Sequence, residues 1–176
     1  METEPGGIEL RRADITTLDV DAIVNAANVS LAGGGGVDGA VHRAGGPGIM
    51  RELRERYNGC ATGSAVITGA GRMPSRFVIH AVGPRWRDGE HGEPDLLRSA
   101  YRRAFALAAE RGLVTVAAPS ISTGIYGFPI EAAAAIALGE ARRALVAEGT
   151  PIVDIAFALF SSGDVAVFSG ALQALA

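Results

Sequence analysis

Polar side chains that could bind or act on a ligand flank a run of glycines early in the chain. Asn25 and Asn28 precede this run, and Asp38 follows it. Carboxamides donate to and accept from sugar hydroxyls, and a carboxylate can act as a base or orient a water molecule. These residues also have structural interpretations, because asparagines stabilise turns and an aspartate before Gly39 can cap a helix. For Asp38 the sequence leaves cap and catalyst about equally open.

The glycine run and a second loop could both bind phosphate. Four consecutive glycines at 33–36 allow main-chain amides to approach a ligand, and amides at the start of a helix bind anions. A flexible turn is the alternative interpretation. The second loop, residues 119–129, also connects an apolar segment to a helical one. Neither loop contains lysine or arginine, Arg43 lying beyond the first, so we expect neutral backbone donors to hold the anion.

A dinucleotide-binding fingerprint is the competing enzyme interpretation of the glycines. Gly34, Gly36 and Gly39 satisfy G-x-G-x-x-G. That fingerprint belongs directly in a strand-to-helix turn and needs an acidic residue ending the second strand. Here residues 26–32 separate the expected strand from the glycines, and Glu52 and Glu55 fall in an expected helix. Hydride transfer is therefore disfavoured.

The histidines and the cysteine do not predict a metal site. His42 lies four residues after Asp38, so in a helix the two side chains would share a face. His80 ends an apolar segment, where we expect it to anchor the backbone, and His91 is expected to be solvated. Three dispersed histidines do not form a ligand set, and Cys60 has no adjacent base.

The basic residues exclude several reaction classes. The chain has no lysine, because all sixteen basic residues are arginine, and the formal net charge is −3. A Schiff-base enzyme, a pyridoxal site and a P-loop lysine are therefore excluded. The arginines are scattered along expected helices, as at Arg51, Arg54 and Arg98, and general nucleic-acid binding is not expected.

Length and hydropathy predict one globular domain over residues 1–176. The chain is 48% hydrophobic and 20% charged, which allows a substantial core. No apolar run approaches the ~20 residues that span a bilayer, and the polar start at 1–7 does not resemble a secretion signal. A single cysteine excludes an internal disulfide. We expect a cytoplasmic protein with no membrane association.

Alternating apolar and helical segments predict the elements that position these residues. Apolar runs typical of buried strands occur at 8–13, 21–25, 64–68, 77–82, 114–119 and 154–160. Helical segments with proline starts and glycine stops occur at 46–57, 94–111 and 129–148, and further helices are expected at 37–44, after the glycine loop, and at 163–176. This alternation indicates an α/β fold with a largely parallel sheet, in which ligands bind beyond the carboxyl ends of the strands.

Together, five segments resemble the macrodomain family, in particular its MacroD-type branch with the bacterial O-acetyl-ADP-ribose deacetylases. They are Ala-Asp-Ile-Thr at 13–16, Asp-Ala-Ile-Val-Asn-Ala-Ala-Asn at 21–28, Gly-Gly-Gly-Gly-Val-Asp-Gly-Ala-Val-His at 33–42, Val-Ile-His-Ala-Val-Gly-Pro at 78–84 and Ile-Ser-Thr-Gly-Ile-Tyr-Gly-Phe-Pro at 121–129. The resemblance covers nearly the whole chain and implies a three-layer α/β/α sandwich with a mixed, largely parallel central sheet. Ala13, where the family often has glycine, and the segment 43–46 depart from the pattern away from the proposed chemistry.

The resemblance also implies roles for individual residues. Asp14, Ile15 and Phe160 would form an adenine pocket. Asn25 and Asn28 would orient the distal ribose, against which Tyr126 would pack, and Asp38 would activate or position water. The residues expected to wrap the diphosphate are Gly33, Gly34, Gly35, Gly36, Val37, Ser122, Thr123, Gly124, Ile125 and Tyr126.

The activity implied is hydrolysis of acyl esters of ADP-ribose without a metal or cofactor. The substrate would be O-acetyl-ADP-ribose, or a glutamate or aspartate of a mono-ADP-ribosylated protein, and the products ADP-ribose and a free acid. The alternative is a non-catalytic reader of ADP-ribosylated partners, in which Asp38 only caps a helix. Phosphatase action on ADP-ribose phosphate, known in other branches, is less consistent with the Gly-Val-Asp-Gly segment at 36–39.

Overall fold

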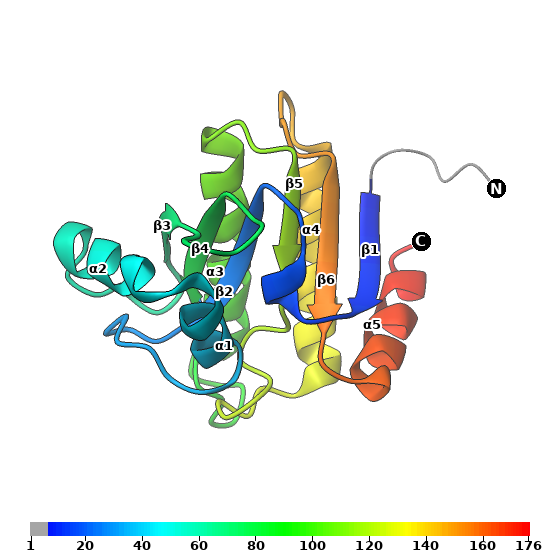
Figure 1. Cartoon of the computed structure of the whole chain (residues 1–176). Helices are drawn as coiled ribbons and strands as arrows, with labels where there is room; N and C mark the ends of the chain where they lie inside the picture. Colours follow the sequence, from blue (N-terminus) through cyan, green and yellow to red (C-terminus); the bar gives the residue numbers. More distant parts are fainter. Residues whose placement is uncertain (1–6) are drawn as a thin grey trace.

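The computed structural model describes residues 7–176 and shows a six-stranded sheet covered by helices (Figure 1). The strand order is β1-β6-β5-β2-β4-β3, and all neighbouring strands are parallel except β4 and β3. The predicted mixed, largely parallel sheet is therefore confirmed. The sequence argument against a secretion signal used residues 1–7, and residues 1–6 of this segment lie outside the described part of the chain.

The elements follow the predicted segments with shifts of one or two residues at most ends. They are β1 Gly7–Arg12, the 3₁₀-helix η1 Ile15–Thr17, β2 Ala22–Ala27, α1 Gly36–Gly45, α2 Pro47–Arg56, β3 Ala65–Gly69, β4 Phe77–Val82, α3 Glu93–Glu110, β5 Thr115–Ala118, α4 Ile130–Val146, β6 Asp154–Leu159 and α5 Ser162–Ala174. The 3₁₀-helix was not predicted. Asp14 caps it, since its carboxylate accepts a hydrogen bond from the Thr16 amide.

Helices cover both faces of the sheet, which explains why its central strands are apolar on both sides. On one face α3, α4 and α5 pack over a core that includes Tyr101, Phe157 and Phe168. On the other face α1 and α2 enclose a smaller core with Val41 and Ile49. The structure thus has the three layers expected of an α/β/α sandwich.

The arrangement of β5 and β2 brings the two predicted loops together. These strands are parallel neighbours at the centre of the sheet. Their carboxyl ends therefore lie at the same edge, and the glycine loop leaves β2 beside the loop that leaves β5 (Figure 1). α5 begins after β6 at this edge and runs back, so the C-terminus lies away from both loops.

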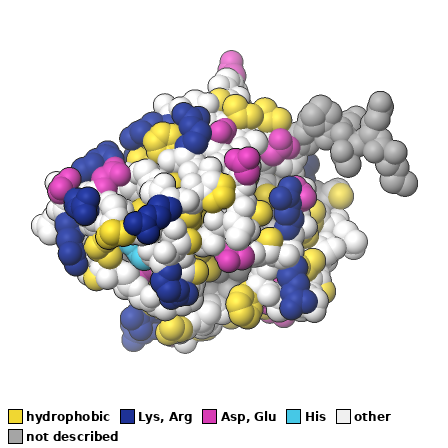
Figure 2. Space-filling model, in the orientation of Figure 1, with side chains coloured by type: hydrophobic (Ala, Val, Ile, Leu, Met, Phe, Trp, Pro, Cys, Tyr) yellow, Lys and Arg dark blue, Asp and Glu magenta, His cyan; other side chains and the backbone are white. Residues whose placement is uncertain are grey.

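The face of the molecule drawn in Figure 2 carries both basic and acidic side chains. In the view of Figure 2, arginines are separated by acidic, apolar and backbone atoms. Within residues 7–176, no helix has the length and apolar character required to cross a membrane.

Tyr101 connects the core to the loop that follows β5. Its side chain is fully buried, and its hydroxyl donates to the Pro119 carbonyl (2.7 Å) and accepts from the Ile121 amide (2.8 Å). Burial raises the pKa of this hydroxyl well above its usual value, so it stays a neutral donor. The loop therefore starts from a backbone held at two points.

Tyr101→Phe is expected to lower the free energy of unfolding by about 1–3 kcal/mol, because it leaves a buried carbonyl and a buried amide without their partner. Urea denaturation measures this loss. Tyr57→Phe is the matched control, since the Ile67 carbonyl that binds the Tyr57 hydroxyl keeps a second donor in Arg56. Equal losses in the two variants would contradict the role given to Tyr101.

Candidate functional site

The two loops form the walls of one cleft with two ends. One end, the Asp38 pocket, has a volume of about 320 Å³ and is lined by Asn28, Asp38, Arg85 and Tyr126 among others. The other, the Asp14 pocket, is larger, at about 840 Å³. Both ends share Gly36, Val37, Ser120 and Gly124 as lining residues. An elongated ligand could therefore occupy both ends and pass between the loops.

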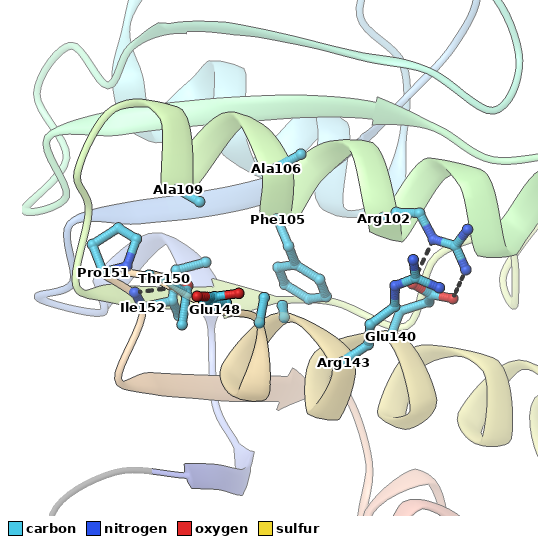
Figure 3. Close-up of a pocket in the computed structure, with 13 residues that line it drawn as sticks. Arg102, Phe105, Ala106, Ala109, Glu140, Arg143, Glu148, Thr150, Pro151 and Ile152 are labelled. Atoms are coloured by element: carbon cyan, nitrogen blue, oxygen red, sulfur yellow. Dashed lines mark hydrogen bonds and ion pairs between the residues drawn. The ribbon is translucent and has the colours of Figure 1, made fainter.

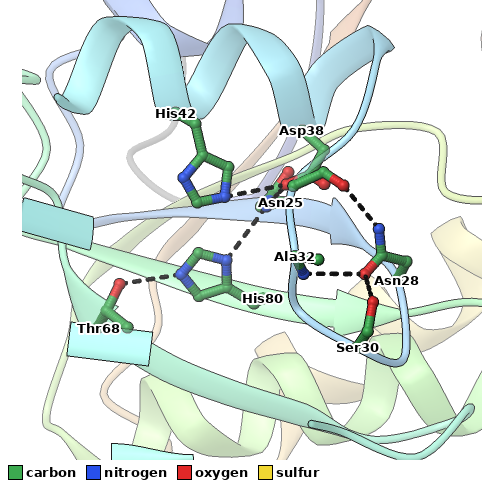
Figure 4. Close-up of polar contacts among 9 residues, drawn as sticks. Asn25, Asn28, Ser30, Ala32, Asp38, His42, Thr68 and His80 are labelled. Carbon is green, nitrogen blue, oxygen red and sulfur yellow. Dashed lines mark hydrogen bonds and ion pairs between the residues drawn. The ribbon is translucent and has the colours of Figure 1, made fainter. Parts of the chain in front are cut away.

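Asp38 points from the first turn of α1 toward the end of β2 (Figure 4). Its Oδ1 accepts a hydrogen bond from Asn25 Nδ2 (2.8 Å) and lies 3.3 Å from His42 Nε2. The helix begins after Gly35, which occupies the cap position, so the interpretation of Asp38 as a helix cap is wrong. In the described part of the chain both polar contacts of this carboxylate end on Oδ1, which leaves Oδ2 for a ligand or water.

The surroundings keep the Asp38 carboxylate charged although it is 6% exposed. Burial opposes the charge, but the contacts from His42 and Asn25 outweigh it and lower the pKa of the carboxyl below its usual value. The start of α1 also favours a negative charge. An ionised carboxylate is therefore held ready at neutral pH.

A buried chain of side-chain contacts lies behind Asp38 and Asn25. Asn25 Nδ2 also lies 3.1 Å from His80 Nδ1, and His80 Nε2 lies 2.9 Å from Thr68 Oγ1 (Figure 4). An amide nitrogen only donates, so His80 accepts at Nδ1 and carries its proton on Nε2. His80 thus contacts side chains, and the prediction that it anchors the backbone is wrong. Burial lowers its pKa to about 4.

Asn28 holds the shape of the glycine loop. Its Nδ2 donates to the Gly33 carbonyl (2.9 Å), and its Oδ1 accepts from Ser30 Oγ (2.9 Å) and the Ala32 amide (3.2 Å). These contacts match the turn-stabilising interpretation of asparagine. Asn28 also lines the Asp38 pocket, so the residue that supports the glycine loop lies at the candidate site as well.

The second loop is held in a strained and closely packed conformation. Ser122 has a φ of 68°, which is uncommon for a residue with a side chain, and its buried hydroxyl lacks a partner among the described residues. The Phe128 amide donates to the Ser122 carbonyl, and the Trp86 amide donates to the Tyr126 carbonyl (2.8 Å). Thr123 bonds to Ser120, whereas Ile125 is 88% exposed. Ser122, Gly124, Ile125 and Tyr126 line the Asp38 pocket.

The Asp14 pocket brings together the three residues predicted for adenine. Asp14 Oδ1 is used by Thr16, whose amide and hydroxyl both donate to it. Ile15 is buried, and Phe160, at the end of β6, is 92% exposed. All three line this pocket. Because the Phe160 ring is almost fully exposed to water, it offers a free apolar face on which a ligand ring can pack.

Three arginines line the cleft that the sequence did not assign to it. Arg85 lines the Asp38 pocket, and Arg12 and Arg43 line the Asp14 pocket. The cleft therefore offers cationic side chains in addition to the neutral backbone donors of the two loops. Arg85 directly follows the segment 78–84, and this position after a strand beside β2 was the available signal.

A further pocket, of about 280 Å³, lies between α3, α4 and the segment before β6 (Figure 3). At one end Arg102 makes two hydrogen bonds, of 3.0 and 2.8 Å, to Glu140, a carboxylate only 6% exposed. Arg102 thus fastens two helices rather than facing only solvent. None of the residues predicted for the functional site lines this pocket.

Ligating atoms of Asp88, His91 and Glu93 lie within 4.8 Å of one another. Glu93 accepts hydrogen bonds from the amides of Arg87, Asp88, Gly89 and His91, which explains its buried position without a cation. His91 is exposed as predicted and is paired with Asp88 at 2.8 Å. The other two histidines, His42 and His80, stack with ring centroids 6.2 Å apart.

The model of a family described as "Macro domain" matches residues 24–137. A Macro domain-containing protein of Caldanaerobacter subterraneus is 54% identical over 171 residues, which are 96% of this chain and 97% of that protein. An O-acetyl-ADP-ribose deacetylase of Pantoea vagans is 59% identical over 134 residues, 74% of this chain and 78% of that protein.

Solved structures agree with this similarity. The Oceanobacillus iheyensis macrodomain with ADP has a TM-score of 0.89 and 38% identity, with 99% of this chain and 94% of that chain covered. The Trypanosoma brucei macrodomain in complex with ADP-ribose has a TM-score of 0.86 and 40% identity, with 96% of this chain and 69% of that chain covered.

His80 is expected to remain neutral, with its proton on Nε2, from pH 8 down to about pH 5, and to titrate near pH 4. Nitrogen-15 NMR of the imidazole distinguishes the tautomers and follows the titration. Because the folded pKa lies below the unfolded value of about 6.5, folding stability falls as pH decreases through this window, by up to about 1.4 kcal/mol per pH unit. His80→Gln should remove that part of the slope, and His91→Gln should not. A His80 that titrates near pH 6.5 would refute the assignment.

Proposed function

The chain belongs to the Macro domain family, and on this premise we propose that it binds ADP-ribose and hydrolyses acyl esters at the ribose distal to adenine. The substrates are O-acetyl-ADP-ribose, or glutamate and aspartate esters on mono-ADP-ribosylated proteins. The two ends of the cleft, joined between two loops, support this proposal, because ADP-ribose is an elongated ligand with a diphosphate at its middle.

The proposed position of the ligand follows from the chemistry of each end. Adenine occupies the Asp14 pocket, where Phe160 and Ile15 offer apolar surface and Asp14 Oδ2 can accept from an amino group. The diphosphate crosses the shared wall at Gly36 and Gly124, where backbone amides at the start of α1 can donate. The distal ribose then enters the Asp38 pocket beside Asn28 and Tyr126.

The observation that carries the hydrolase proposal is the ionised Asp38 carboxylate, held through Oδ1 with Oδ2 uncommitted. A water bound to Oδ2 would stand at the distal ribose. Water adds across the ester bond, the bond between acyl carbon and ribose oxygen breaks, the acyl group leaves as a carboxylic acid and the ribose hydroxyl is restored. A carboxylate with a lowered pKa is a weak base, so Asp38 contributes mainly by orienting the water.

A non-catalytic reader is the second candidate, and one observation favours it. The Asn28 carboxamide makes its hydrogen bonds within the glycine loop, so these contacts support the loop structure rather than a reacting group. A reader would bind ADP-ribose with the same cleft and leave its esters intact. Turnover therefore separates the two candidates, and binding does not.

Asp38→Ala is expected to lower kcat on O-acetyl-ADP-ribose by about 10²-fold or more and to leave the Kd for ADP-ribose nearly unchanged. Asp14→Ala should have the opposite effect, weakening binding with a smaller change in kcat. Asp95→Ala, an exposed acid on α3, is the control for loss of a carboxylate. Release of ADP-ribose under chelator and calorimetric titration measure the two quantities. Wild-type protein that binds ADP-ribose and releases none from any ester would leave only the reader.

Phe160→Ala is expected to weaken ADP-ribose binding by about fivefold to tenfold, as for the loss of one stacked aromatic ring, and to leave Tm within about 1 °C. Its side chain is 92% exposed, so folding gains little from it. Val146→Ala, also exposed but remote from the cleft, should change neither quantity. A large drop in Tm, or unchanged affinity, would argue against adenine packing on Phe160.

A further inference from the structure

Arg85 is a cation at the end of the cleft that contains Asp38. It lines the Asp38 pocket and is absent from the lining of the Asp14 pocket. In the proposed position of the ligand, this end holds the distal ribose and the acyl group attached to it. Arg85 is therefore placed beside the part of the substrate that differs between one ester and another.

The guanidinium is held but not neutralised. Its central carbon lies 4.6 Å from the centroid of the Tyr126 ring, over the ring face. Within residues 7–176, none of the ion pairs involves Arg85. A planar guanidinium that rests on an aromatic ring keeps its N–H groups available at the edge, where they match a carboxylate.

The backbone that directly follows Arg85 is held by several contacts. The Trp86 amide donates to the Tyr126 carbonyl (2.8 Å), and the Trp86 ring packs edge-on against Phe128 at 4.8 Å. Beyond it, Glu93 binds the amides of Arg87, Asp88 and Gly89. Arg85 is thus presented from a rigid segment, which reduces the entropy lost when it binds a ligand.

We propose that Arg85 is a specificity residue that recognises a second negative charge on the acyl side of the substrate, beyond the ester that is cleaved. This inference rests on the proposed ester hydrolysis. The substrate class it favours is a glutamate-linked mono-ADP-ribosylated peptide with acidic neighbours. An acetyl group offers no such charge, so Arg85 has no ionic partner in O-acetyl-ADP-ribose.

The test compares kcat/KM for two peptides that carry ADP-ribose on a glutamate, one with aspartates on both sides of it and one with asparagines. Wild-type protein is expected to prefer the acidic peptide by about fivefold, the range for a partly exposed ion pair with good geometry. Arg85→Ala should reduce the ratio to about one, and Arg85→Glu should invert it. High salt should reduce the wild-type ratio, since exposed charges are screened.

Arg87→Ala is the matched control, because Arg87 is two residues away, is exposed and lines neither pocket. It should keep the wild-type ratio. A wild-type ratio of one, or an Arg85→Ala variant that slows both peptides equally, would overturn the inference and leave Arg85 as a support for Tyr126. If the wild-type protein cleaves none of the three substrates, the two peptides and O-acetyl-ADP-ribose, the hydrolase proposal itself is refuted.

Discussion

A buried hydrogen bond from the Asn25 amide to the Asp38 carboxylate joins the central strand β2 to helix α1. Asn25 is fully buried, so a broken bond would leave a polar group without water to replace the partner. The Asn25 amide also contacts His80, which in turn contacts Thr68. The bond to Asp38 fixes the distance between the end of β2 and the start of α1, and the glycine loop has to connect the two across that distance. The start of α1 and the position of the carboxylate therefore depend on this contact between strand and helix, while Asn28 supports the loop between them.

The same contact explains how the site tolerates a charge among buried atoms. The carboxylate is satisfied on Oδ1 by Asn25 and His42, and Asp38 lines the cleft with no polar contact to Oδ2 from residues 7–176. A neutral His80 fits this arrangement, because burial disfavours a charge on its ring. His80 thus contributes through its position and its tautomer, and His42 through its contact with Asp38.

Local sequence predicted most of the fold, because its signals act within a few residues. Pro47 starts α2, Pro94 lies in the first turn of α3, and Gly112 and Gly149 follow helices with left-handed φ values of 69° and 71°. The end of β2 was harder to predict. The polar Asn25 interrupts the apolar pattern, yet pairing with β4 continues from Asn25 and His80 to Ala27 and Val82. That continuation depends on the neighbouring strand, which local patterns do not identify.

The site was predictable where residues lie in contiguous motifs and not where the fold joins distant segments. Asp38, Asn28 and Tyr126, which the resemblance assigned to the distal ribose, line one pocket, whereas Asn25, assigned with them, is fully buried and does not line it. The partners of His80 could not be predicted, because they come from two other strands. Arg85 was missed for the same reason, because the ring on which its guanidinium packs belongs to Tyr126, far along the chain.

The direction of α5 has a consequence for attaching the protein to a surface or a label. Since α5 runs back from the edge that carries both loops, a surface, a dye or a fused protein linked at the C-terminus would leave the mouth of the cleft open.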